Sequence, residues 1–348
     1  MNVSELLLGL DAVIVTAPPD LFFLSGIENA DAIVLLTEKE NLYIASPLYE
    51  VEAHRSLALW LTPMIVSAKE KTMAIRHELK GAKAIGMQLS SVDVETYNRL
   101  LQGLSAKVSD VSEKLYALRY VKSEREIELM TKAEAMVDAA FDKVLAEIAV
   151  GMTEKEVRNV LQMEMLRCGA DGFAFDTIVA FGENAAKPHA VPSERRLRKG
   201  DCVVMDFGAK FGGYCSDFTR TVFCGAPSDK AREAYEVVLC AHKAALKYIS
   251  DGGRSASEAD RIARDVIDGS PFRGKFCHSL GHGVGVEIHE PPYLKPQSAD
   301  VLTDGNVFTI EPGVYVEGEF GIRIESLAAI QNGKVTVIDR SNKEIITV

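Results

Sequence analysis

The chain has 348 residues, of which 47% are hydrophobic, so we expect two domains, each with a sizeable core. The formal net charge of −11 at pH 7 argues against nucleic acids and anionic membranes as partners, because both are themselves negatively charged. No apolar run approaches the roughly 18 residues that a membrane-spanning helix needs, and residues 1–11 lack the basic stretch of a signal peptide. We therefore expect a cytoplasmic protein.

The N-terminal third alternates β-branched and aromatic runs with turn signals. The predicted strands span residues 11–16, 30–37, 41–46 and 84–88. A helix is predicted over residues 93–102, after the fourth strand. These elements indicate an α/β domain over residues 1–113, in which the sequence shows no cluster of catalytic side chains.

An internal repeat organises the second domain, which we expect over residues 114–348. Ser123-Glu-Arg-Glu126 is a capping box that begins a long helix into this domain. Two pairs of segments match each other, one pair as helix starts with a Ser/Thr-x-x-Glu box and one pair as strands with a carboxylate between two glycines. They are residues 151–156 with 253–258, and 200–208 with 305–313. The repeat predicts two half-domains related by a pseudo-two-fold axis, each a helical segment followed by a hairpin.

Each predicted hairpin carries a pair of carboxylates. Folding the first about the midpoint of Phe211 and Gly212 places Asp206 opposite Asp217. The second hairpin in the same way sets Glu311 opposite Glu325. Directly opposed residues have Cβ atoms about 5 Å apart, and like charges repel there. We therefore expect a positive group between them.

These acids, with one histidine, form a predicted metal-binding set. A single pair is typical of solvated acids on an outer sheet face, but two pairs in equivalent settings favour metal ligands. The predicted ligands are Asp206, Asp217, His282, Glu311 and Glu325. Carboxylates with one imidazole suit manganese, cobalt, iron or zinc, and four carboxylates are enough to bridge two ions. A dinuclear site indicates hydrolysis.

Four motifs surround the predicted ligands. They are Asp206-Phe-Gly-x(8)-Asp217-Phe-Thr-Arg-Thr221, His278-Ser-Leu-Gly-His282-Gly-Val-Gly-Val-Glu-Ile-His289-Glu-x-Pro, Thr309-Ile-Glu311-Pro-Gly-Val-Tyr315 and Gly321-Ile-Arg-Ile-Glu325. Together they resemble one known family, the pita-bread metallopeptidases of the prolidase and aminopeptidase P group. The resemblance runs from about residue 115 to the end and is looser before it. All five ligand positions are filled, unlike in creatinase, while Ser326 stands where the family usually has an Asp.

The resemblance implies a fold and an activity. The expected fold is a creatinase/prolidase-like α/β N-terminal domain followed by an α+β pita-bread catalytic domain with an internal pseudo-two-fold repeat. The expected cofactors are two divalent metal ions, manganese, cobalt or zinc, and the expected substrate is a proline-containing dipeptide or short peptide. In the family the N-terminal domain dimerises and helps to wall the active site, so a homodimer is implied.

The remaining polar residues are interpreted through the reaction. Hydrolysis of an amide creates an oxyanion that needs donors, and His278 and His289 flank the ligand histidine closely enough to supply one. By resemblance, His189 contacts substrate and Glu311 is both a ligand and a proton shuttle. Arg323 is equally consistent with a salt bridge to the ligand carboxylates and with capture of a substrate carboxylate.

Three other sets of residues receive structural or open interpretations. Tyr315 is as consistent with donation to a ligand as with packing. Arg220 is expected to be structural. The six cysteines show no metal spacing, and although Cys202 and Cys224 could face each other across a hairpin, free thiols are expected.

The predicted function is hydrolysis of Xaa-Pro bonds, with the Xaa-Pro dipeptidase preferred over the Xaa-Pro aminopeptidase. The imide before proline lacks an N–H and has a fixed φ, so peptidases that bind extended amides handle it poorly. Two alternatives on the same fold are a hydrolase of non-peptide amides and a non-catalytic binding module. The binding module predicts lost ligands, and none is lost.

Overall fold

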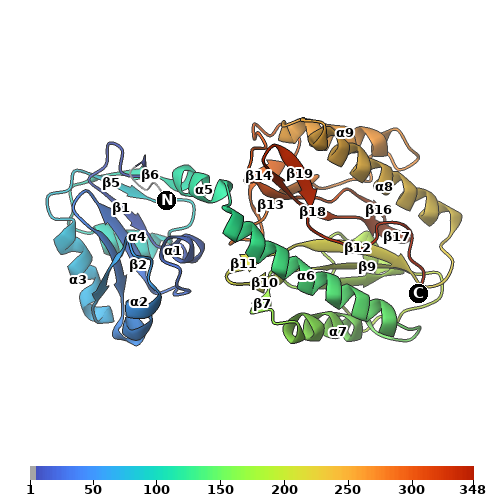
Figure 1. The fold of residues 1–348 in the computed structure, drawn as a ribbon, viewed down its shortest axis with the longest axis horizontal. Helices are drawn as coiled ribbons and strands as arrows, with labels where there is room; N and C mark the ends of the chain where they lie inside the picture. The colour runs from blue at the N-terminus through green and yellow to red at the C-terminus, as the bar shows by residue number, and fades with distance from the viewer. Residues whose placement is uncertain (1–4) are drawn as a thin grey trace. The chain divides into compact units, whose positions relative to one another are not determined.

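The computed structural model describes residues 5–348, which pack as two compact units (Figure 1). One unit extends to Arg119 and the other runs from Tyr120 to Val348. The division falls inside the helix α5 (Ser112–Tyr120). The domain boundary expected after residue 113 stays a prediction, and residues 1–4 of the expected N-terminal domain lie outside the described residues.

The first unit contains a mixed six-stranded sheet in the order β4-β3-β2-β1-β5-β6. Its strands are β1 (Ala12–Val15), β2 (Ile33–Thr37), β3 (Asn41–Ala45), β4 (Thr62–Ile65), β5 (Ala84–Met87) and β6 (Lys107–Asp110). The four predicted strands correspond to β1, β2, β3 and β5. The sequence does not predict the edge strands β4 and β6, because neither contains a buried residue and both lack the hydrophobic signal of a buried strand.

Helices cover both faces of this sheet. They are α1 (Pro18–Ser25), α2 (Glu50–Ser56), α3 (Ala68–Glu78), α4 (Val94–Leu101) and a short 3-10 turn, η2 (Pro47–Tyr49). Alternation along β1 sends Val13 and Val15 into one core with α1 and α2, and Ile14 into another core with α3 and α4. The expected α/β architecture of this part of the chain is confirmed.

The second unit contains two helix pairs. They are α6 (Glu124–Glu147) with α7 (Glu154–Arg167), and α8 (Asp229–Ser250) with α9 (Ala256–Asp268), and the members of each pair lie side by side (Figure 1). The predicted capping boxes at Ser123 and Thr153 begin α6 and α7. Ser255 caps α9 by accepting a hydrogen bond from the Glu258 amide. None of the described helices is both long and apolar enough to cross a membrane.

The strands of this unit lie between the helix pairs. In chain order they are β7 (Gly172–Phe173), β8 (Ile178–Phe181), β9 (Cys202–Phe207), β10 (Ala209–Phe211), β11 (Tyr214–Cys215), β12 (Phe218–Phe223), β13 (Gly281–Gly283), β14 (Glu290–Leu294), β15 (Val307–Ile310), β16 (Gly313–Val316), β17 (Phe320–Arg323), β18 (Ser326–Gln331) and β19 (Lys334–Val337), with a 3-10 turn η3 (Gly182–Ala186). The sheets have the orders β11-β10-β7, β12-β9-β8, β14-β13-β15-β18-β19 and β16-β17.

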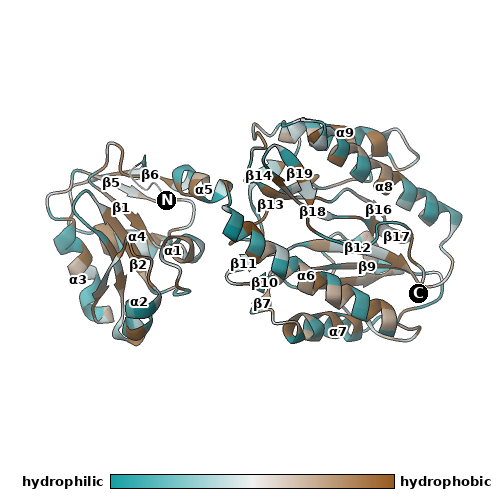
Figure 2. Ribbon diagram, in the orientation of Figure 1, coloured by the Kyte–Doolittle hydropathy of each residue, from teal (hydrophilic) through white to brown (hydrophobic). Residues whose placement is uncertain are grey.

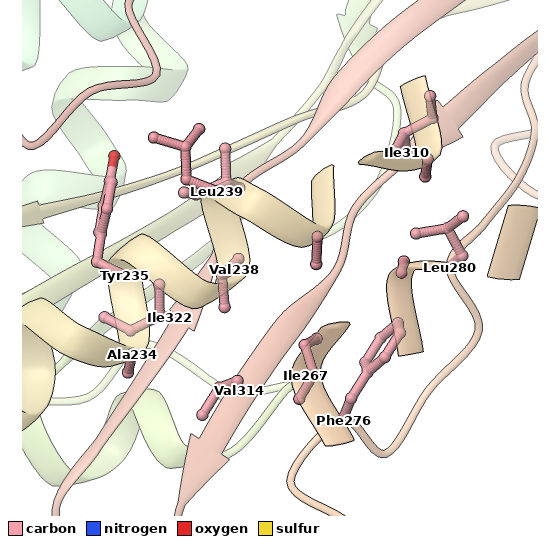
Figure 3. Close-up of a cluster of buried hydrophobic side chains, with 14 of the residues drawn as sticks. Ala234, Tyr235, Val238, Leu239, Ile267, Phe276, Leu280, Ile310, Val314 and Ile322 are labelled. Atoms are coloured by element: carbon pink, nitrogen blue, oxygen red, sulfur yellow. The ribbon is translucent and has the colours of Figure 1, made fainter. Parts of the chain in front are cut away.

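Two hydrophobic cores hold the strands between the helices. Val203, Met205 and Phe207 of β9 face the core that includes α6 and α7, whereas Val204 faces the core that includes α8 and α9. Figure 3 shows side chains of α8, such as Val238, in the core that includes α8 and α9. Figure 2 shows α8 and α9 hydrophobic along part of their surface and hydrophilic along the rest, as helices on the outside of a core must be.

The internal repeat is visible in the backbone. Thr153, the N-cap of α7, forms an isolated antiparallel bridge with Arg196, and Ser255, the N-cap of α9, forms the same kind of bridge with Val301. Each half therefore anchors the start of its second helix to the segment before a strand, β9 or β15, that carries or directly precedes a predicted ligand. This equivalence supports the predicted pseudo-two-fold arrangement.

Candidate metal centre

The first carboxylate-bearing hairpin has a different register from the predicted one. Thr219, not Asp217, lies opposite Asp206 in the pairing of β9 with β12. The turn is centred between Gly212 and Gly213, both with positive φ, rather than one residue earlier. Two consecutive residues with positive φ suit a tight hairpin turn and favour glycine at both positions.

The carboxylates of this hairpin nevertheless converge. Asp217 immediately precedes β12 instead of facing Asp206 from within it. One ligand atom from each of Asp206, Asp217 and Glu325 lies within 4.8 Å of the other two. The irregular segment between β11 and β12 thus brings Asp217 to the site by a route that strand pairing alone does not provide.

The second hairpin keeps its predicted register. Ile310, the last residue of β15, pairs with Ser326, the first residue of β18. Gly313, the first residue of β16, pairs with Arg323, the last residue of β17. Glu311 and Glu325 lie between these two pairs. The same register on both sides places the two glutamates opposite each other.

His282 joins the two halves of the site. Its Nε2 lies 3.4 Å from Asp217 Oδ2 and 3.3 Å from Glu311 Oε1. Its Nδ1 lies 3.0 Å from the Gly283 carbonyl oxygen and donates to it, which leaves Nε2 of the neutral ring free to bind a metal. A Cβ on Gly281 would lie 2.1 Å from the Thr309 carbonyl oxygen, so only glycine permits this approach.

The electrostatics of the acids are those of an uncompensated anionic site. Burial, reinforced by neighbouring carboxylates, raises the pKa of Asp217 and Glu325 well above the ordinary carboxyl range. Burial also raises the pKa of Asp206, although Arg323 opposes this. Glu325 Oε1 is buried and has no hydrogen-bond partner. Buried carboxylates without compensating charge fit a cation, so these residues suit divalent metal ions.

Glu311 and His282 form the compensated part of the site. Burial alone would raise the pKa of Glu311, but the hydrogen bond and charge of His282, with His278 and Arg323 nearby, lower it to about 2. Burial likewise opposes the charged form of His282, yet the hydrogen bond and charge of Glu311 leave its pKa raised. Glu311 is therefore ionised at neutral pH.

Arg323 is bound inside the site. Its Nη2 donates to Asp206 Oδ2 at 2.6 Å, and its Nη1 donates to the Tyr315 hydroxyl at 2.7 Å. The Tyr315 oxygen also lies 2.9 Å from Nε2 of His278. Of the two interpretations of Arg323, the structure contains the salt bridge, which is to the predicted ligand Asp206. Tyr315 contacts none of the five predicted ligands through these bonds and instead links Arg323 to His278.

Two other predictions about polar residues can be compared with the structure. Arg220 is buried and pairs with Asp339 at 2.6 Å, a structural arrangement as expected. The six cysteines are free, and Phe223, not Cys224, lies opposite Cys202.

A cavity of about 730 Å³ lies beside the acids and is lined by all the predicted site residues. Its lining includes Asp206, Asp217, His282, Glu311, Glu325, His189, His278, His289 and Arg323. Sequence reasoning did not single out Arg158 and Gln162 of α7, which also line it. A helix far upstream of the ligand motifs carries no local signal that it borders their cavity.

Two further histidines, His278 and His289, lie close to the predicted ligands. His289 stacks edge-on against His282, with ring centroids 4.2 Å apart. Burial and the nearby charge of His282 lower the pKa of His289, and burial lowers the pKa of His278. His278 Nδ1 donates to the Ser279 carbonyl oxygen at 2.8 Å. Because the Tyr315 hydroxyl occupies Nε2 of His278, His289 is better placed than His278 to donate a hydrogen bond to a ligand in the cavity.

Known proteins match this chain along its whole length. Residues 128–332 match the model of Metallopeptidase family M24, and residues 7–121 match that of the Creatinase/Prolidase N-terminal domain. An Xaa-Pro dipeptidase of Pyrococcus horikoshii is 35% identical over 97% of this chain and 95% of the relative.

Solved structures show the same fold. An Xaa-Pro dipeptidase from Bacillus anthracis is 34% identical, with a TM-score of 0.93 over 98% of this chain and 96% of that one. An X-Pro aminopeptidase from Thermotoga maritima is 33% identical, with a TM-score of 0.90 over 100% of both chains. The expected combination of an α/β N-terminal domain with a pita-bread catalytic domain is confirmed by these matches.

Proposed function

This chain belongs to Metallopeptidase family M24, and from this premise we propose that it hydrolyses Xaa-Pro peptide bonds, acting as an Xaa-Pro dipeptidase. The observation that carries the proposal is the convergence of five potential ligands in one cavity of about 730 Å³. They are Asp206, Asp217, His282, Glu311 and Glu325. The dipeptidases among its full-length relatives and similar structures support the choice of substrate.

The proposed cofactors are two divalent metal ions, manganese, cobalt or zinc, held by these five side chains. When bound, such ions activate water and stabilise the negative charge that develops on a carbonyl oxygen. The fit is supported by the buried Glu325 oxygen that has no partner. It is also supported by the closeness of the ligand atoms of Asp206, Asp217 and Glu325.

The chain's own residues account for the proton transfers. Glu311 is ionised at neutral pH and can accept a proton from the attacking water. It can then deliver this proton to the departing proline nitrogen, which carries no hydrogen while it is part of the peptide bond. His289 is neutral at the same pH and can donate a hydrogen bond to the developing oxyanion. His189 lines the same cavity and is proposed to contact substrate. His278 and Arg323 also line it, and the Tyr315 hydroxyl links them to each other.

A second candidate function is that of an Xaa-Pro aminopeptidase, which removes the residue before proline from a longer peptide. The aminopeptidase among the similar structures resembles this chain about as closely as the dipeptidase does. The two activities differ in whether the carboxyl end of the proline must be free. We place the dipeptidase first because two full-length relatives, 35% and 34% identical to this chain, are Xaa-Pro dipeptidases.

The proposal extends to domains, assembly and location. We propose an N-terminal domain over residues 1–113 and a catalytic domain over residues 114–348. We propose a homodimer formed through the N-terminal domain, on the basis of the resemblance of that domain to its family. A cytoplasmic site of action is supported by six cysteines that form no disulfide.

The test combines a substrate panel with metal analysis of the same sample. Ala-Pro, Arg-Pro-Pro and Ala-Ala are offered to the metal-loaded protein, and bound metal is measured by elemental analysis. The proposal expects stoichiometric divalent metal, cleavage of Ala-Pro and no cleavage of Ala-Ala. Equal or better cleavage of Arg-Pro-Pro would make the aminopeptidase the correct activity, and active protein without transition metal would refute the metal site. Asp217→Asn should lose metal while it keeps its fold.

A further inference from the structure

An arginine outside the ligand motifs lines the catalytic cavity without an acidic partner. Arg158 is half-buried on α7 and borders the cavity. Its Nε and Nη2 donate to Oδ1 of Asn159 at 3.1 and 2.8 Å, a neutral acceptor that leaves the positive charge uncompensated. The other guanidinium in the described lining belongs to Arg323, and that one is bound to Asp206.

The helix that carries Arg158 is firmly anchored. Thr153 and Glu156 form a complete capping box at its start. Glu154 is fully buried and accepts hydrogen bonds from the Phe181 amide at 2.9 Å and the Ser193 amide at 2.8 Å. Charged groups held on rigid elements lose little freedom when they bind a ligand, so a cation on this helix is well placed to determine specificity.

The neighbouring cavity wall places donors beside the guanidinium. Gln162 lies one helical turn after Arg158, borders the same cavity and donates from Nε2 to the Thr177 hydroxyl at 3.3 Å. An arginine fork matches a carboxylate through two parallel N–H···O bonds. When a substrate carboxylate replaces the Asn159 amide oxygen as the acceptor of the Arg158 hydrogen bonds, the guanidinium gains a negatively charged partner, and no ion pair has to break.

We propose that Arg158 binds the free C-terminal carboxylate of the peptide substrate and thereby sets the preference for short peptides. The inference rests on the proposed Xaa-Pro hydrolysis and names the residue that would recognise the carboxyl end. Arg323 serves this role poorly, because its guanidinium is already bound to Asp206 and Tyr315. The substrate class that fits Arg158 is a peptide with a free carboxylate near the scissile imide.

One acid in the same lining offers Arg158 an alternative role. Asp176 is exposed and borders the cavity, and no ion pair joins it to Arg158 in the structure. If Arg158 only balanced this charge during catalysis, removal of the acid would make the arginine unnecessary. The Asp176→Asn background therefore separates carboxylate binding from charge balance.

The experiment compares kcat/KM for Ala-Pro with kcat/KM for Ala-Pro amide. Arg158→Ala should lower the acid-to-amide ratio roughly 10- to 100-fold, mainly through KM, because hydrogen bonds to a charged group are lost. The acid-to-amide ratio of Arg158→Lys should lie between those of the wild type and Arg158→Ala, because lysine keeps the positive charge but cannot form two parallel hydrogen bonds to a carboxylate. Arg167→Ala is the matched control, because Arg167 is on the same helix but is 69% exposed and paired with Glu164.

The outcomes separate this inference from the proposed function. If wild-type protein cleaves neither substrate, the proposed Xaa-Pro hydrolysis fails. If it cleaves Ala-Pro and the ratio is the same in Arg158→Ala and Arg167→Ala, the proposed hydrolysis stands and the role of Arg158 is refuted. Loss of the effect in the Asp176→Asn background would also refute carboxylate binding. Inhibition by proline should weaken in Arg158→Ala, while inhibition by prolinamide provides the uncharged comparison.

Discussion

Replacing Arg220 by methionine should strongly destabilise the second unit. The guanidinium is about 1% exposed and donates to Asp339 Oδ2 at 2.6 Å. It also donates to four main-chain carbonyl oxygens, those of Thr219, Glu325, Ser341 and Asn342, at 2.6 to 3.1 Å. Methionine fills part of the volume but offers none of these bonds.

The magnitude follows from what the substitution leaves behind. Removing one partner of a buried ion pair costs about 3–5 kcal/mol, mostly because the other charge stays buried. Lys343 still pairs with Asp339, so the lower half of this range is expected. For a unit of this size each kcal/mol lowers the melting temperature by roughly 2–4 °C, which gives a fall of about 6–16 °C.

Calorimetry of three variants tests this reasoning. Arg261→Met is the matched control, because Arg261 is likewise an ion-paired arginine, with Glu258 and Asp265, but its side chain is 59% exposed. Water screens such a pair, so this variant should melt close to the wild type. Asp339→Asn with Arg220→Met should recover part of the loss, because the buried charge is gone. Equal melting temperatures for Arg220→Met and Arg261→Met would refute the argument that burial determines the value of the pair.

The metal site and the backbone around it should respond to three further changes. Gly281→Ala should weaken metal binding in a titration, because its Cβ would meet a main-chain carbonyl oxygen at 2.1 Å, whereas Gly172→Ala, with nothing within 4 Å, should not. Without metal, the melting temperature should fall as the pH rises above the ordinary carboxyl pKa of about 4, since the raised pKa values of Asp217 and Glu325 mean that these groups stabilise the fold only while protonated. A bound divalent ion should remove this dependence of the melting temperature on pH. A metal-free melting temperature that does not change with pH would contradict the prediction. His289→Ala should keep its metal and lose roughly 10²–10³ in kcat, as removal of an oxyanion donor does; turnover at the wild-type rate would show that the side chain only packs.

The two hairpins show how far strand pairing can be predicted from sequence. In the second hairpin a single glycine, Gly318, marks the turn, and the predicted pairing of Glu311 with Glu325 fits the observed register. In the first hairpin two adjacent glycines allow two turn centres, and a shift of one residue in the centre moves every pairing by two. Local sequence does not choose between these centres, so the predicted pairing of Asp206 with Asp217 was wrong.

Tertiary packing determines the features that local patterns cannot reveal. The capping boxes at Ser123 and Thr153 could be predicted because each depends on residues within one helical turn. Arg158 follows Thr153 closely in sequence, yet nothing near it distinguishes it from a solvated charge on a surface helix. Its place in the cavity comes from the packing of α7 against β8, which no short window of sequence encodes.

The site divides its negative charge between groups that the protein neutralises and groups that it does not. Arg323 lies 2.6 Å from Asp206, and His282 lies 3.3 Å from Glu311, so each of these acids has a side-chain partner from the protein. Glu325 has a buried oxygen without a partner, and the pKa of Asp217 is raised by burial and by the surrounding carboxylates. Because repulsion among buried acids falls only when a proton or an external cation arrives, Asp217 and Glu325 make the folded site complementary to metal, while the paired Glu311 remains ionised for proton transfer.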